Sequence, residues 1–164
     1  MKGNKIKTTH HNPRSKATLL LGLILLTACS TNDIYNKQNN IPADGWDIYS
    51  SQTFDIDIAT TSHYDIDLFL RHDNQYKYRN LWLFVDHIAP DSTISTDTIN
   101  IELADNYGHW LGGGWGSTHQ LEQNYLTHQL LDSGRHTIKL TQAMREYKLK
   151  EIKNIGLSVT KSEE

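Results

Sequence analysis

Apolar and polar residues alternate with a period of two along much of the chain, beginning near residue 53. Residues 53–59 place Phe54, Ile56 and Ile58 between polar or small neighbours, and residues 64–71 repeat the arrangement. Such alternation is typical of antiparallel strands with one face in a core and the other in water. The two segments echo each other, so we interpret them as neighbouring strands that face the same way.

The next segments predict more strands. Residues 81–88 are almost all apolar, which favours a central strand covered on both faces. Residues 93–103 alternate again but change phase near Thr98 and Ile99, which predicts a β-bulge. Further strands are expected at 121–131, 136–140 and 155–160, and a short helix within 141–153.

Turn-forming residues separate these segments at a spacing of roughly ten residues, as in all-β domains. We therefore expect an all-β fold: a single antiparallel β-sandwich, jelly-roll-like, with one short helix near the C-terminus. A closed barrel is the alternative. The domain is expected over 46–164, with Trp46 marking the start of ordered structure. Residues 29–45, rich in Asn, Ser, Thr and Asp, are expected to form a flexible tether.

The first 28 residues have the order of a bacterial secretory signal peptide. Basic residues precede the apolar run Ala17–Leu26, and Thr27 and Ala28 stand directly before Cys29. A cysteine at this position predicts a lipoprotein signal: cleavage leaves Cys29 first, with a diacylglycerol on its sulfur and an N-acyl lipid such as palmitate. The apolar run is shorter than the roughly twenty residues that a membrane-spanning helix needs. An ordinary secretory peptide with a chance cysteine is the alternative.

Charge and cysteine content narrow the function classes. The first 28 residues contain five of the sixteen Lys and Arg residues and none of the nineteen Asp and Glu residues, so the remainder carries eleven basic and nineteen acidic residues, a net charge of −8. Phosphate backbones need a basic face, so nucleic acid is not an expected partner. Cys29 is the only cysteine, which leaves the domain without disulfides or cysteine-rich metal sites.

Two groups of residues could bind a metal ion. Asp55, Asp57, Asp65 and Asp67 would share one face if their strands paired, and Ca²⁺ would relieve the repulsion. Straight alternation instead favours an acidic face in solvent. The seven histidines after residue 28 show no metalloprotease spacing. We therefore expect no metal and no cofactor other than the lipid on Cys29.

The run Gly112-Gly113-Gly114-Trp115-Gly116 is the other unusual motif. It lacks the Lys-Ser or Lys-Thr of a P-loop and the third glycine of a dinucleotide fingerprint. We interpret it as an irregular edge loop between an exposed tryptophan pair, with Trp82 assigned to the core. The candidate partner-binding residues are Trp110, Gly112, Gly113, Gly114 and Trp115.

No catalytic residue is expected. Ser117 follows Gly116 but lacks the G-x-S-x-G pattern that exposes a nucleophile, and no carboxylate pair is marked for acid–base work. We therefore expect a non-enzymatic protein that acts through protein contacts. An envelope glycan-binding module that uses exposed tryptophans is the alternative.

One set of residues carries a family resemblance: Tyr35, Ile41-Pro42, Gly45-Trp46, Leu70-Arg71, Tyr76, Tyr78, Asn80-Leu81, Ala104-Asp105, Gly108 to Gly114, Gln142 to Glu146, and Ile155 to Leu157. With these residues the chain resembles the gliding motility lipoproteins called GldH, from Bacteroidetes. Lys77 departs from the pattern where proline is expected, and His109 where a basic residue is expected.

The resemblance implies an outer-membrane lipoprotein of the cell envelope, an accessory component of the gliding apparatus and the type IX secretion machinery, with no assigned catalytic residues. The implied partners are the membrane, through the lipid anchor, and other gliding or secretion envelope proteins, with no small-molecule substrate. Only Asp33 is acidic in Ser30–Asp33, whereas surface-exported lipoproteins of this phylum carry a dense acidic run after the cysteine. We therefore expect the domain to face the periplasm.

Overall fold

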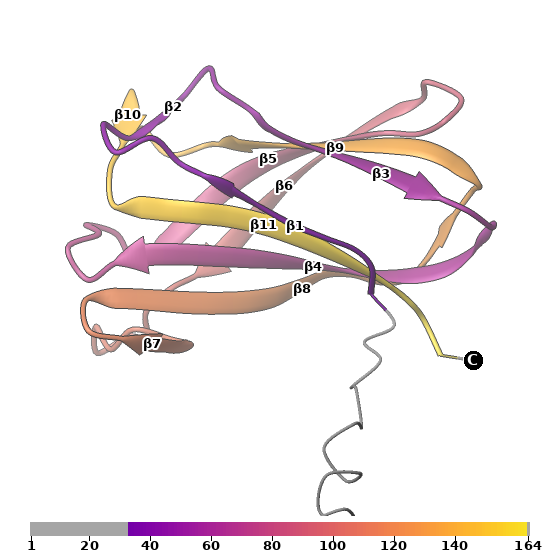
Figure 1. The fold of residues 1–164 in the computed structure, drawn as a ribbon. Coiled ribbons are helices and arrows are strands. Elements are labelled where there is room, and N and C mark those ends of the chain that lie inside the picture. The colour runs from indigo at the N-terminus through magenta and orange to yellow at the C-terminus, as the bar shows by residue number, and fades with distance from the viewer. Residues whose placement is uncertain (1–32, 164) are drawn as a thin grey trace, which may run out of the picture. The chain divides into compact units, whose positions relative to one another are not determined.

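The computed structural model describes residues 33–163, and within them every regular element is a β-strand. Figure 1 shows the strands in chain order. Their bounds are β1 Asp33–Asn40, β2 Trp46–Asp47, β3 Gln52–Ile58, β4 Ser62–Asp73, β5 Asn80–Ile88, β6 Ile94–Glu102, β7 Gly113–Trp115, β8 Thr118–Leu131, β9 Gly134–Gln142, β10 Lys148–Leu149 and β11 Ile152–Lys161. The predicted signal peptide and Cys29 lie outside the described residues.

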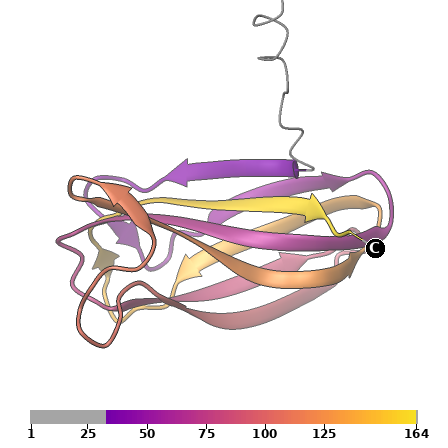
Figure 2. The ribbon, with the colours of Figure 1, turned by 90° about the horizontal axis from the view of Figure 1, so that it is seen from below.

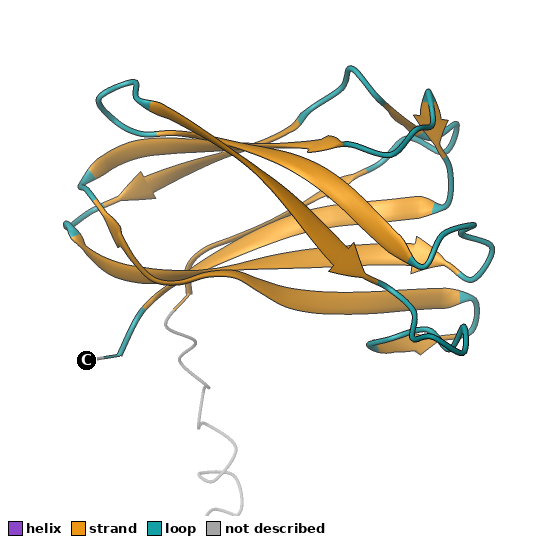
Figure 3. Ribbon diagram, turned by 180° about the vertical axis from the view of Figure 1, so that it is seen from behind, coloured by secondary structure: helices purple, strands orange, loops and turns teal. Residues whose placement is uncertain are grey.

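All strand pairs are antiparallel. A five-stranded sheet has the order β1-β11-β4-β8-β7, a four-stranded sheet has the order β3-β9-β5-β6, and β10 pairs with β2. Figures 1 and 3 show the two large sheets as separate layers. The buried apolar residues of both layers form one core cluster. The expected all-β, antiparallel fold is confirmed.

Strict alternation explains which side chains fill this core. Phe54, Ile56 and Ile58 of β3 are buried, and so are Leu68 and Leu70 of β4. Burying such side chains stabilises the folded state by roughly 25 cal/mol for each Å² of apolar area removed from water. The period-two pattern therefore places each of these strands with its apolar face inward.

The first two alternating segments are not neighbours, which corrects the sequence-based interpretation. β3 pairs with β9, whereas β4 lies between β11 and β8 in the other sheet. The chain crosses from one layer to the other between them. Both strands face the same core, so their patterns match although they never pair.

The short helix expected within 141–153 is absent, and a turn followed by the two-residue strand β10 occupies its place. The fully buried Gln142 explains why. Its carboxamide oxygen accepts a hydrogen bond from the Met144 backbone N–H at 2.9 Å, and its Nε2 donates to the Glu146 carbonyl at 2.8 Å. A side chain that bonds nearby backbone groups offers the chain an alternative to helical hydrogen bonds.

The flexible tether expected over 29–45 is also corrected, because Asp33–Asn40 form β1 at the edge of the five-stranded sheet. β1 pairs with β11 from Asp33–Thr160 to Asn40–Asn154. Its side chains are mostly polar and exposed, but pairing uses backbone groups that every residue carries. Figure 2 shows β1 running along the sheet from the point where the described chain begins.

Two further expectations fail in the four-stranded sheet. β5 is a central strand, but only one of its faces is covered: Trp82 is 41% exposed and Phe84 is 47% exposed. The pairing of β5 with β6 is continuous across Thr98 and Ile99, so the predicted bulge is absent there. The register instead shifts opposite Tyr64–Asp67, where β8 pairs with β4.

Candidate functional site

The glycine-rich run forms an edge hairpin with β8, in which β7 pairs Gly113 with Gln120 and Trp115 with Thr118. A Cβ on Gly112 would lie 2.2 Å from the Gln120 carbonyl oxygen, and one on Gly114 would lie 2.1 Å from the Thr118 carbonyl oxygen. Neither position has room for a side chain. These glycines allow β7 to approach β8 closely, as the sequence predicted for an edge segment.

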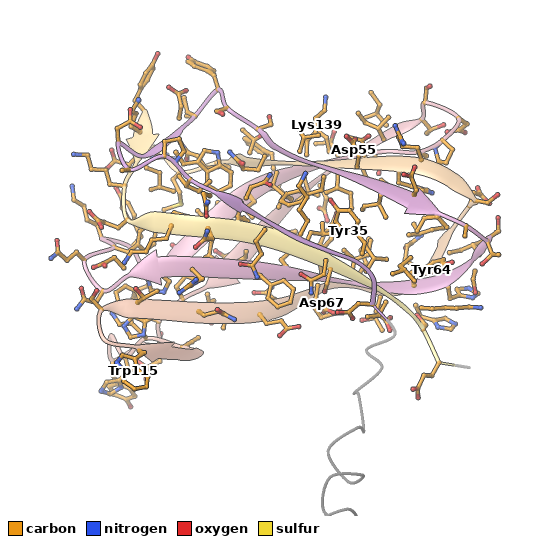
Figure 4. All side chains as sticks on the ribbon, viewed as in Figure 1. Tyr35, Asp55, Tyr64, Asp67, Trp115 and Lys139 are labelled. Atoms are coloured by element: carbon orange, nitrogen blue, oxygen red, sulfur yellow. The ribbon has the colours of Figure 1, made fainter. Side chains whose placement is uncertain are left out.

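The two tryptophans that flank this hairpin occupy different environments. Trp115 is 94% exposed, and Figure 4 shows it projecting away from the sheet. Trp110 is half-buried and packs against the core, with its ring centroid 4.6 Å from that of His72 and 5.7 Å from that of His119. The prediction that both tryptophans are exposed is therefore wrong for Trp110 and confirmed for Trp115.

Beside Trp115 lies an open pocket of about 620 Å³. Gly112, Gly113 and Gly114 line it together with side chains from β4 and β8. The charged and carboxamide side chains at its wall are Arg71, Gln120 and Glu122, each of them exposed. Within residues 33–163, no ion pair or side-chain hydrogen bond occupies Arg71 or Glu122. Both charges are therefore available to a partner molecule.

A polar cluster holds the turn of the hairpin in place. The Lys153 ammonium lies 2.8 Å from Asp73 Oδ2, and the Ser117 hydroxyl donates to the same oxygen at 3.1 Å. Lys153 also donates to the Thr118 hydroxyl at 3.0 Å, and the Asn74 N–H donates to the Ser117 carbonyl at 2.7 Å. The hydrogen bond from Lys153 is the main reason why the pKa of Asp73 is lowered. The hairpin is thus tied to β4 and β11, so Trp115 is displayed on an anchored element.

Beneath the hairpin, His72 is fully buried between Trp110 and Tyr76. Its Nδ1 lies 3.0 Å from the Asp73 carbonyl oxygen, which can only accept, so Nδ1 carries the proton. Its Nε2 has no hydrogen-bond partner. Burial lowers the pKa of His72, so the ring is neutral and serves as part of the packed layer under the hairpin.

The four aspartates singled out by the sequence do not share one face. Figure 4 shows Asp55 and Asp67 in different layers. Asp55 accepts a hydrogen bond from the Thr137 hydroxyl at 2.7 Å, and Asp57 forms an ion pair with Arg135 at 2.9 Å, which lowers the pKa of Asp57. Asp65 accepts a hydrogen bond from the His128 N–H and Asp67 from the Asn124 carboxamide, so each of the four carboxylates has a partner on its own sheet.

Among residues 33–163, no group of three or more His, Cys, Asp or Glu side chains is placed to hold a metal ion. The same range contains no helix long and apolar enough to cross a bilayer.

Sequence reasoning missed two features of the outer surface. Arg71, Gln120 and Glu122 come from β4 and β8 and meet Trp115 only when these strands pair. Trp82 and Phe84 lie on the outer face of β5, and strict alternation from the buried Leu81, Leu83 and Val85 is the signal that could have found them.

Comparisons with known proteins place the chain in a family. A family model described as GldH lipoprotein matches residues 33–159. A gliding motility lipoprotein GldH homolog from Christiangramia forsetii is 28% identical over 150 residues, which cover 86% of this chain and 91% of the relative. The gliding motility lipoprotein GldH of Flavobacterium johnsoniae is 26% identical over 134 residues, which cover 81% of this chain and 83% of the relative.

The solved structures offer a weaker likeness. The structure of the infectious bursal disease virus Gx strain aligns with a TM-score of 0.35 and 16% identity, over 78% of this chain and 29% of that chain. This chain therefore spans less than a third of the viral chain, and the TM-score is too low to indicate a shared fold. The family match extends over nearly the whole described domain, and the chain belongs to the GldH lipoprotein family.

Proposed function

We propose that this chain is a gliding motility lipoprotein, anchored through lipid on Cys29 to the outer membrane with its domain facing the periplasm. In this role it is a non-enzymatic accessory component that contacts other envelope proteins of the gliding and type IX secretion apparatus. The names of both relatives and the lipoprotein signal in residues 1–29 support the proposal. Lipidation would raise the effective concentration of the domain near partners at the same membrane.

The observation that carries a contact role is the exposure of Trp115 on an anchored hairpin. Aromatic residues and arginine are enriched at the centres of protein interfaces, where they supply most of the binding energy. Trp115 and Arg71 line one pocket, and neither side chain is buried by the domain itself. We propose the β7 hairpin, with Gly112, Gly113 and Gly114 as its backbone and Trp115 as its anchor, as the partner-contact surface.

The two sheets support a finer description of the fold. We propose a β-sandwich of jelly-roll type, because early and late strands alternate across both sheets: β1-β11-β4-β8 in one and β3-β9-β5-β6 in the other. Double-sheet jelly rolls are built from such nested Greek-key connections.

The glycan-binding alternative called for two exposed tryptophan rings along one groove. Trp110 is half-buried and packs against the core, so it does not present a free ring face as Trp115 does. Trp115 alone does not favour a sugar over a protein partner, so glycan binding becomes an outcome of the test.

The test is photo-crosslinking in intact cells of the native host, from a reactive side chain placed at position 115. The matched control carries the same group at Phe84, an exposed aromatic position on the other sheet. We expect position 115 to capture envelope proteins of the gliding or secretion apparatus in larger amount than position 84. Equal capture from both positions, or crosslinks from 115 to glycan alone, would contradict the proposed contact surface.

A further inference from the structure

The start of β1 limits how far the domain can lie from a lipid on Cys29. Asp33 already belongs to β1 and pairs with Thr160 near the end of β11. Only Ser30, Thr31 and Asn32 lie between Cys29 and Asp33, so the link is four residue steps long. Because an extended residue spans at most about 3.3–3.6 Å, the link reaches no more than about 14 Å.

The β7 hairpin lies at the diagonally opposite corner of the same sheet. β1 is one edge and β7 is the other, so four strand spacings of about 4.8 Å, or roughly 19 Å, lie between them. Along the strands, Thr160 pairs with Asp65, whereas Thr118 pairs with Asp73 at the other end of β4, roughly 26 Å away. The two displacements together separate Asp33 from the hairpin by about 30 Å. Figure 1 shows β7 at the end opposite the start of β1.

From these two facts we infer that the corner formed by Asp33 and the end of β11 rests beside the bilayer, while the β7 hairpin with Trp115 faces away from it. The inference depends on the proposed lipid anchor at Cys29. The hairpin is distant from Asp33 both along the strands and across the sheet. The inferred arrangement therefore holds whether the domain stands on its strand ends or lies on its β1 edge.

The charges at the membrane-proximal corner do not suggest a second means of attachment. Its exposed charged groups are Asp33, Lys161 and Glu163, a mixture without a basic cluster. Polybasic segments are what anionic lipid surfaces attract. The short covalent link, rather than electrostatic attraction, therefore keeps this corner close to the bilayer.

The experiment uses the full-length lipoprotein in proteoliposomes. Cys29 is the only cysteine, and lipidation consumes its thiol, so an introduced cysteine is the single site for a fluorophore. One variant is Lys161→Cys, at the proximal corner. The other is Gly113→Cys, where an added Cβ meets no atom within 4 Å. Lipids with a nitroxide on the headgroup then quench only labels close to the bilayer.

We expect several-fold stronger quenching of the label at position 161 than of the label at position 113. A chain with a long Gly-Ser insertion between Asn32 and Asp33 serves as the control, because it should abolish most of the difference. Equal quenching at both positions of the unmodified chain, or stronger quenching at 113, would overturn the orientation.

A separate measurement tells apart the failure of the anchor from the failure of the orientation. Flotation of the vesicles and mass spectrometry of the N-terminal peptide report whether Cys29 is acylated. A protein that stays behind with a free thiol overturns the anchor and the orientation together. A protein that floats with an acylated Cys29 but shows the wrong quenching order overturns the orientation alone.

Discussion

The Nε2 atom of His87 lies 2.9 Å from the Nδ1 atom of His136 between the two sheets. His136 is nearly fully buried, and its Nε2 lies 2.8 Å from the Asp132 carbonyl oxygen, so that nitrogen must donate. With Nδ1 unprotonated, His136 accepts from the His87 Nε2–H. The hydrogen bond needs one of the two facing nitrogens to be free of a proton, so two doubly protonated rings could not form it.

The first prediction concerns pH. Burial, and to a lesser extent His136, lowers the pKa of His87 below its ordinary value of 6.5. Between those two pKa values the unfolded chain binds more protons than the folded one, so the free energy of unfolding falls as the pH falls below about 6.5. His72 acts in the same direction. Urea unfolding at about pH 7.5 and about pH 5 should show the loss.

The control is His87→Gln, which keeps an N–H donor but cannot titrate. Between these two pH values its free energy of unfolding should fall by less than that of the unmodified chain. An equal fall in both would contradict this role for His87.

The second prediction separates two adjacent glycines. Gly114→Ala places a methyl group against the Thr118 carbonyl oxygen and must push β7 from β8, at an expected cost of about 1–3 kcal/mol. Gly113→Ala points into open space and should change stability by about 0.5 kcal/mol or less. Chemical denaturation of both variants makes the comparison. Similar costs for the two would mean that the close approach of β7 to β8 is not what requires glycine.

The third prediction tests the exposed face of β5. Leu83 is fully buried, so Leu83→Ala should cost about 2–5 kcal/mol through lost burial and a cavity. Phe84 points outward, and Phe84→Ala should cost about 1 kcal/mol or less. Thermal and urea unfolding report both values. A large loss of stability in Phe84→Ala would mean that this side chain packs against other parts of the protein and does not point into solvent.

The fourth prediction compares the two tryptophans near the hairpin. Trp110→Ala removes a ring packed on His72 and the core and should cost about 2–3 kcal/mol. Trp115→Ala should leave the free energy of unfolding within about 0.5 kcal/mol of the unmodified value. Trp115→Ala is thus the variant suited to binding experiments, and marked destabilisation by it would remove that use.

The fifth prediction concerns the turn that replaces the expected helix. Gln142→Leu retains much of the buried volume but leaves the Met144 N–H and the Glu146 carbonyl without their partner. The expected loss is about 1–3 kcal/mol. Hydrogen exchange should show the Met144 amide losing protection before the amides of β9. Unchanged protection would mean that the carboxamide does not hold the turn.

The period-two pattern was sufficient to identify most strands and the faces they bury, because alternation is a local property of each strand. Phe54, Ile56 and Ile58 point into the core as the pattern predicts. The exposure of Trp115 and the edge position of its glycines were also predictable, since a run of glycines rarely lies inside a sheet.

Pairing of strands distant in the sequence decided the rest. The polar segment Asp33–Asn40 becomes β1 because β11 offers it a free edge, and nothing in its composition records that edge. Arg71 and Glu122 stand beside Trp115 only because β4, β8 and β7 are adjacent in one sheet. The local pattern thus determined which residues face inward, whereas contacts between distant segments determined which residues meet. The physical reason is that every strand carries the same backbone donors and acceptors, so its own sequence does not specify which strand it pairs with.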